Sequence, residues 1–350
     1  MTDQPHDNLR SPANRPEFTP TGIAAQDSLS SSAPLDEPAP LDEPAPLDEP
    51  APPRPAMNTA TPLFHSGEPA LFASVLSPDP TTERIPNFAH LLLLIPFVAF
   101  GIIAASIALY LGVDLHLFGA TTVKSAVGDI HYLLGSEMIL YLFALLPCLF
   151  IFPIFWQKSF FAGLQWNFAA TRRRHRRLVS TAAICFTLAI LNGQLMPSPD
   201  NAPIEKVFRS PGAPWLLFFF GITFAPFFEE MLYRGFLLPS LATAWDWAVE
   251  RTLHKPAPPL GENGHPQWSL PAMIVASIFT SLPFALMHVD QQGHALGPFL
   301  LLIVISLVLC AVRLANRSLA SSILVHACYN FLLFSMMLIS SNGFRNLDKM

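Results

Sequence analysis

Long apolar stretches separated by shorter polar ones make up most of the chain from residue 88 onward. A helix of about 20 apolar residues crosses the hydrocarbon core of a bilayer, and seven stretches approach or exceed that length. They are Phe88–Leu111, Tyr132–Trp156, Leu178–Leu195, Pro214–Leu238, Pro271–Val289, Pro298–Val312 and Leu319–Ile339. The pattern predicts an all-α fold, a polytopic membrane helical bundle with about seven transmembrane helices.

The composition agrees with a membrane protein. Of the 350 residues, 51% are hydrophobic and 13% are charged, whereas a soluble domain carries about 25% charged residues. The four cysteines all lie in apolar stretches without paired spacing, so we expect neither a disulfide framework nor a cysteine-type zinc site. The apolar stretches make the lipid bilayer an expected partner. The net charge of −5 gives no reason to expect binding to nucleic acid.

Residues 1–86 form a different kind of segment, rich in Pro, Ser, Asp and Glu. Ala-Pro-Leu-Asp-Glu-Pro occurs three times in tandem, from Ala33 to Pro50. Proline at this density opposes a helix, and there are few apolar side chains to form a core. We expect a disordered tail, and no cleavable signal peptide because no apolar run occurs early.

Basic residues set the expected topology. Arg172–Arg177 holds five arginines in the predicted loop Gln157–Arg177, which the positive-inside rule places in the cytoplasm together with the N terminus. The same arginines would attract anionic lipid. Arg313 and Arg317 predict a second cytoplasmic turn, and Leu241–Leu253 predicts an amphipathic helix at the membrane interface.

Two carboxylates and a guanidinium interrupt the fourth apolar stretch. On a helix Glu230 and Arg234 are four residues apart with the acid first, which favours an ion pair. Glu229 points about 100° away from Glu230, so it is free to project into a cavity, as a general base would. Charges deep in a bilayer are costly and often mark function; the alternative is that these three snorkel to the interface.

Two further pairs have the same four-residue spacing. Phe284 and His288 share one face of the fifth helix, and His326 and Asn330 share one face of the seventh. The histidine and asparagine of the second pair can both donate hydrogen bonds toward a cavity, as an oxyanion hole requires. Taken singly, each polar residue is explained equally well by hydrogen bonds between helices. Three such constellations in one bundle favour a functional site.

The set Glu229-Glu230-x-x-x-Arg234, Phe284-x-x-x-His288 and His326-x-x-x-Asn330 resembles the CPBP family of intramembrane endopeptidases. That family includes the type II CAAX prenyl proteases and the bacterial bacteriocin-processing and Abi-type proteins. The resemblance covers about Leu178 to Ile339. It divides the chain into three expected parts: the tail (1–86), the first two transmembrane helices with the basic loop (87–177), and a CPBP-like catalytic membrane domain (178–340).

The resemblance implies hydrolysis of a peptide bond in a membrane-anchored protein or peptide, of which a prenylated CAAX-type protein is one example. Glu229 would act as general base, and His288 would help to hold and activate the attacking water. No cofactor is firmly expected. Zinc held by Glu229, His288 and His326 is an alternative, but the sequence has no His-Glu-x-x-His motif, which favours a mechanism without metal.

The remaining motif residues receive supporting roles from the same resemblance. His326 and Asn330 would stabilise the oxyanion of the tetrahedral intermediate, while Glu230 and Arg234 would position and tune the site. The tail and the small number of spans suit a bacterial protein, so we expect an integral protein of the inner membrane.

Two other classes of function stay open. An ion-coupled transporter would use intramembrane Glu, His and Arg as a relay, and it predicts inverted repeats, which the sequence does not display. A non-catalytic membrane scaffold or bacteriocin-immunity protein would keep the motifs as buried hydrogen-bond networks.

Counting along the helices leaves one difficulty, the depth of His288. It falls near the outer end of the fifth helix, whereas Glu229 and His326 fall near mid-membrane. For the three to meet, that helix must be displaced, be kinked at Pro283, or be followed by a loop, Val289–Leu296, that dips inward.

Overall fold

The computed structural model describes residues 84–196, 208, 212–258 and 267–345. Most of the predicted tail, residues 1–83, lies outside the described residues, as do residues 197–207, 209–211, 259–266 and 346–350. Throughout the described part the regular secondary structure is helical, as the apolar pattern predicts.

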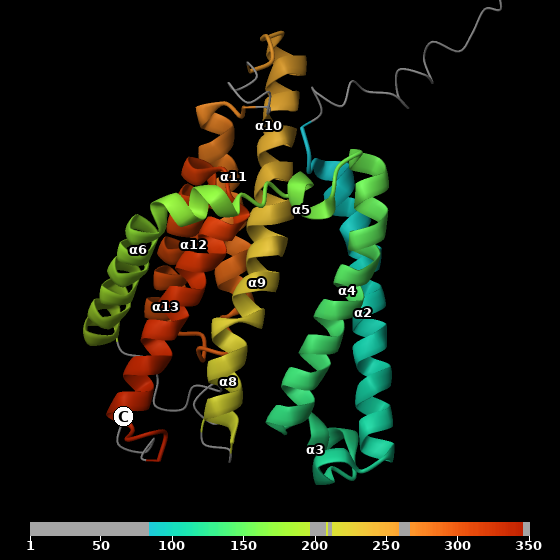
Figure 1. Cartoon of the computed structure of the whole chain (residues 1–350), viewed down its shortest axis with the longest axis vertical. Coiled ribbons are helices and arrows are strands. Elements are labelled where there is room, and N and C mark those ends of the chain that lie inside the picture. Colours follow the sequence, from blue (N-terminus) through green and yellow to red (C-terminus); the bar gives the residue numbers. More distant parts are fainter. Residues whose placement is uncertain (1–83, 197–207, 209–211, 259–266, 346–350) are drawn as a thin grey trace, which may run out of the picture. The chain divides into compact units, whose positions relative to one another are not determined.

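Seven helices in the described part are long and apolar enough to cross a membrane, so the predicted architecture is confirmed (Figure 1). They are α2 (Phe88–Asp114), α4 (Ile130–Trp156), α6 (Phe168–Leu195), a composite helix over Ala213–Leu253, α11 (Leu270–Met287), α12 (Leu296–Asn316) and α13 (Leu319–Ser340). Shorter elements join them: η1 (Leu117–Gly119), α3 (Val123–Val127) and α5 (Phe160–Gly163).

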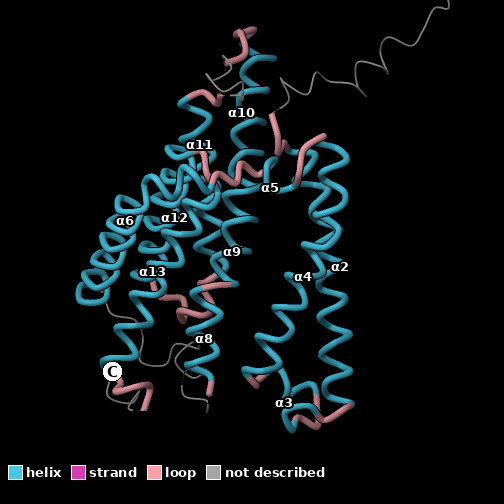
Figure 2. The backbone as a smooth tube through the Cα atoms, viewed as in Figure 1, coloured by secondary structure: helices cyan, strands magenta, loops and turns pink. Residues whose placement is uncertain are grey.

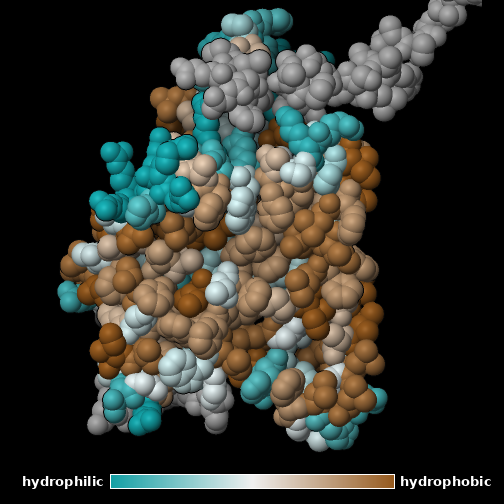
Figure 3. All heavy atoms as spheres, in the orientation of Figure 1, coloured by the Kyte–Doolittle hydropathy of each residue, from teal (hydrophilic) through white to brown (hydrophobic). Residues whose placement is uncertain are grey.

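The surface divides as a bilayer requires. Figure 3 shows hydrophobic side chains across the middle of one face, with hydrophilic ones gathered toward both ends. On α4, Phe150 and Ile154 are each about two-thirds exposed, which is natural for lipid-facing side chains. The chain is an integral membrane protein.

The composite helix carries the first motif. It consists of α8 (Ala213–Ile222), α9 (Phe224–Glu230), the π-helical segment η2 (Met231–Leu237) and α10 (Leu238–Leu253). Thr223 breaks it between α8 and α9, where Pro226 has no N–H to return to the carbonyl of Ile222. The predicted interfacial segment Leu241–Leu253 is the greater part of α10 and continues from η2 without a break.

Helix α6 begins ten residues earlier than expected and takes in the arginine cluster. The side chain of Asn167 caps it, accepting a hydrogen bond from the backbone N of Ala170 at 2.9 Å. Alanine and arginine both favour helix, so nothing in Phe168–Arg177 opposes extension of the apolar helix. The prediction of a loop at Arg172–Arg177 is therefore wrong.

Four buried clusters in the described residues hold the helices together, and two of them are the largest. In one, α2, α4 and α5 pack around Phe152 and Trp156 against Phe228 and Phe236 of the composite helix. In the other, α6 packs against α12 and α13. Helix α6 therefore belongs with the C-terminal helices that carry the second histidine motif.

The short length of α11 resolves the depth of His288. The helix ends at Met287, and His288 caps it. Figure 2 shows the loop that follows α11 in pink, part-way along the bundle beside α13 and α9. The end of α11 thus lies part-way along the bundle, and the polar loop after it is largely exposed, with the side chains of Asp290 and His294 92% and 73% exposed.

Candidate active site

Glu230 is the buried anchor of the site. Its side chain is fully buried, and Oε1 accepts hydrogen bonds from Nη1 of Arg234 at 2.9 Å and from Nδ1 of His326 at 3.0 Å. The predicted pairing of Glu230 with Arg234 is present. It spans the junction of α9 and the π-helical segment η2, a distortion that is frequent at functional sites.

Arg234 extends this network to α12. Its Nη2 donates to the hydroxyl of Ser306 at 2.6 Å and to the carbonyl of the same residue at 3.1 Å. The guanidinium carbon also lies 4.5 Å from the centre of the Phe284 ring. One arginine therefore joins elements that carry parts of the first and second motifs.

Glu229 differs from its neighbour in accepting no hydrogen bond from the described residues, whereas Glu230 accepts two at Oε1. Its side chain is 12% exposed, and the buried Oε2 has no hydrogen-bond partner in the described part of the chain. The nearest ionisable atom is Nε2 of His326 at 3.9 Å, beyond hydrogen-bond range. A carboxylate oxygen left without a partner in a buried setting is available for water or substrate.

The contacts of His326 fix its tautomer. An ionised carboxylate only accepts hydrogen bonds, so Nδ1 must be the nitrogen that donates to Glu230. In the neutral ring Nε2 is then a lone pair directed toward Glu229. Nε2 carries a hydrogen only when His326 is an imidazolium, and that imidazolium would lie between two carboxylates.

His288 is oriented in the same way. Its Nδ1 donates to the carbonyl of Phe284 at 2.8 Å, which leaves Nε2 as the free nitrogen. The Phe284 ring lies 5.1 Å from the ring of His288 and 6.0 Å from that of His326. Phe284 is therefore the residue at which the second and third motifs meet.

Asn330 does not reach Glu229 directly. Its Nδ2 donates to the carbonyl of Gly221 at 2.7 Å, next to the break at Thr223 that deprives this part of α8 of regular helix bonds. One amide hydrogen thus holds α8 against α13, and the second hydrogen remains for a ligand.

The zinc alternative requires several ligand side chains arranged around one point. Within the described residues no group of three or more His, Cys, Asp or Glu side chains is arranged to hold a metal ion. Glu229, His288 and His326 do not form such a group in this structure.

Three residues important to the site escaped the sequence reasoning. Ser306 gives no signal in the sequence. Arg313, expected at a cytoplasmic turn, is only 2% exposed and donates to the side chain of Gln165 at 2.9 Å. Glu137 in α4 accepts a hydrogen bond from the hydroxyl of Tyr141 at 2.5 Å, and the same four-residue spacing as in the other motifs could have revealed this pair.

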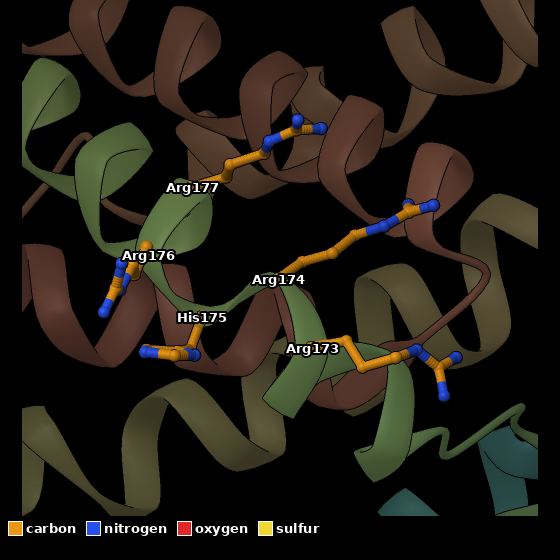
Figure 4. A pocket seen from close by; sticks show the side chains of 5 residues that line it. All are labelled: Arg173, Arg174, His175, Arg176 and Arg177. Carbon is orange, nitrogen blue, oxygen red and sulfur yellow. The ribbon is translucent and has the colours of Figure 1, made fainter.

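The arginine cluster is not part of this site. Figure 4 shows the side chains of Arg173, Arg174 and Arg177 extending to one side of α6 and that of Arg176 to the other. Arg174 donates to Asn316 at 2.9 Å, and Arg173 is exposed. The cluster is a broad basic surface at one end of the helix, without convergence on a single point.

Comparison with protein families gives one match. A protein-family model described as "Type II CAAX prenyl endopeptidase Rce1-like" matches residues 211–332. The chain carries an Rce1-like domain. It contains all three motifs, and the predicted resemblance to the CPBP family is confirmed. The match supports peptidase activity in general. Comparison with curated proteins and with solved structures finds no match.

Proposed function

We propose that the protein is an intramembrane endopeptidase that hydrolyses a peptide bond of a membrane-associated protein with a water activated by glutamate and histidine. The observation that carries the proposal is the contrast between adjacent carboxylates. Glu230 is fully buried and pairs with Arg234 at 2.9 Å, whereas the side chain of Glu229 is 12% exposed and accepts no hydrogen bond from the described residues.

In the proposed reaction Oε2 of Glu229 accepts a hydrogen from water, and Nε2 of His288 helps to hold that water. The water oxygen attacks the carbonyl carbon as its proton passes to Glu229. The carbon–nitrogen bond then breaks as Glu229 passes this proton to the leaving nitrogen, and a new carboxyl group and a free amine result.

The oxyanion of the tetrahedral intermediate is assigned to His326 and Asn330. Because Nδ1 of His326 already donates to Glu230, Nε2 can donate to an oxyanion only in the imidazolium form. Asn330 contributes the amide hydrogen that does not bond Gly221. Such preorganised donors are worth about 10²–10³ in rate where they have been removed by mutation.

We further propose a prenylated CAAX-type substrate, from which the three residues after the lipidated cysteine are removed. The protein would lie in a bacterial inner membrane with its N terminus in the cytoplasm. The five arginines at the start of α6, four of which are shown in Figure 4, support this orientation, because basic residues near helix ends favour the cytoplasmic side and attract anionic lipid.

Purified protein in vesicles of phosphatidylethanolamine and phosphatidylglycerol provides the test. The probe is a fluorescent peptide ending in a farnesylated cysteine and three further residues, compared with a palmitoylated peptide that lacks the prenyl group. We expect release of the C-terminal tripeptide from the farnesylated peptide, and a loss of at least about 10²-fold in Glu229→Gln, as for removal of a general base.

Glu250→Gln is the matched control, since Glu250 pairs with Arg84 at 2.8 Å, away from the motifs. It should cleave like the wild type. Equal cleavage by Glu229→Gln and the wild type would refute the mechanism. Cleavage of the palmitoylated peptide alone would retain the hydrolase and refute the prenylated substrate.

A further inference from the structure

Helix α4 lies outside the Rce1-like domain, yet it places a carboxylate beside the candidate site. Glu137 is half-buried in the second turn of this 27-residue apolar helix. Its charge is close enough to interact electrostatically with both Glu229 and His288. A membrane-embedded carboxylate with this position needs an explanation, since an unused one only adds a cost to folding.

Tyr141 holds this carboxylate in place. Its hydroxyl donates to Oε1 of Glu137 at 2.5 Å, one turn away on the same helix. Its ring stacks on Phe228, the residue before Glu229, with centroids 4.5 Å apart and planes 22° apart. Tyr141 also stacks on Phe220 of α8. The pair is thereby fixed relative to the helix that carries the proposed base.

The second oxygen of Glu137 is unused. Oε2 accepts no hydrogen bond from the described residues. It is also not one of the unpaired oxygens that are fully buried, so it is partly accessible. Tyr141 and Phe228 also line an apolar cavity of about 110 Å³ bordered by α2, α4, α5 and the composite helix, and its lining includes neither Glu137 nor Glu229. The free oxygen of Glu137 therefore lies outside this cavity and is available to a ligand.

The arrangement of the helices indicates which side of the scissile bond would face Oε2 of Glu137. In Figure 1 α13 lies on one side of α8 and α9, and α4 lies on the other; contacts join α13 to α9 and α4 to α8. A scissile carbonyl whose oxygen faces His326 and Asn330 on α13 has its nitrogen directed away from α13, toward α4.

We infer that Glu137, held by Tyr141, receives the amine side of the scissile bond. In this role, which rests on the proposed function, Oε2 accepts a hydrogen bond from the scissile N–H and keeps it as the nitrogen becomes an amine. No bond to Glu137 forms. The bond that the protein cleaves is therefore expected to be an amide. The nitrogen of an amide must gain a proton before it leaves.

A matched pair of substrates tests this inference. One is the farnesylated peptide, and the other has an ester oxygen in place of the scissile N–H. Glu137→Gln should lower kcat/KM for the amide at least about tenfold, the range for a hydrogen bond to a charged group. For the ester, which lacks the N–H, the loss should be less than about threefold. Tyr141→Phe should show the same selectivity with a smaller loss.

Equal losses on amide and ester, or no loss on the amide, would overturn the inference. Glu137→Asp, which keeps the carboxylate, should recover part of the amide activity, and the folded fraction of each variant is measured by its melting temperature. If Glu137→Gln does not fold, Tyr141→Phe alone decides by its amide-to-ester ratio. A wild type that cleaves neither substrate would instead refute the proposed function, and this inference with it.

Discussion

Two polar regions lie side by side in the bundle and are built differently. Around Glu230 the network is closed to solvent: Glu230 and Arg234 are fully buried, Oε1 of Glu230 accepts bonds from Arg234 and His326, and the arginine is bonded in turn to Ser306, while Oε2 of Glu230 is unpaired. Around Glu229 it is open: its side chain is 12% exposed and accepts no hydrogen bond from the described residues, and Oε2 of Glu137 has no partner among them either. Burying a charge in a bilayer costs free energy in both regions. We infer that the closed region stabilises the fold and that the open region binds substrate and water.

The largest effect on stability is expected in the closed region, from Arg234→Ala. Removing one partner of a buried ion pair costs about 3–5 kcal/mol because the other charge is left uncompensated. Thermal unfolding of the purified protein in detergent should show this loss. Arg173→Ala, which removes an exposed arginine, should leave the melting temperature unchanged. Equal melting temperatures for the two variants would contradict a closed network.

A smaller loss is expected from Ser306→Ala. It removes the 2.6 Å hydrogen bond from Arg234 but leaves the bond to the backbone carbonyl of Ser306. Hydrogen bonds to charged groups contribute about 1.5–3 kcal/mol. Chemical denaturation measures the difference. Ser277→Ala is the control, because Ser277 bonds only its own helix at Met273 and should cost less than about 0.5 kcal/mol.

The smallest effect is expected outside both regions, from Glu250→Gln. Glu250 and Arg84 form an ion pair with side chains 25% and 12% exposed, and such pairs contribute about 0–1 kcal/mol. Stability and peptide cleavage should both stay close to the wild type. A loss as large as that of Arg234→Ala would show that ion pairing as such, rather than enclosure in the network, determines stability.

Much of this architecture could be predicted from the sequence because its causes are local. Apolar length gives the seven spans, and the four-residue spacing of Glu230 and Arg234 gives their ion pair. The spacing of Phe284 and His288 likewise places both on the inner side of one helix end, where the ring of Phe284 faces that of His326.

Features that depend on packing between helices could not be predicted. Arg313 looks like a cytoplasmic charge in the sequence, but α5 and its loop bury it through Gln165 and Leu164. Which nitrogen of His326 meets Glu230 depends on the rotation of α13 against α9. The role of Glu137 depends on how α4 packs against α8. The arginines of α6 lie in a helix and not in the predicted loop, because helix propensity and the Asn167 cap outweigh their charge.

The division between the two regions is tested most directly by comparing Glu229→Gln with Glu230→Gln, measuring cleavage per folded molecule in the same vesicles. We predict that Glu229→Gln folds in wild-type yield and loses at least about 10²-fold in cleavage. We predict that Glu230→Gln mainly loses folded protein, since it leaves Arg234 without its carboxylate. Wild-type cleavage by folded Glu229→Gln, or equal loss of folded protein in both variants, would contradict the account.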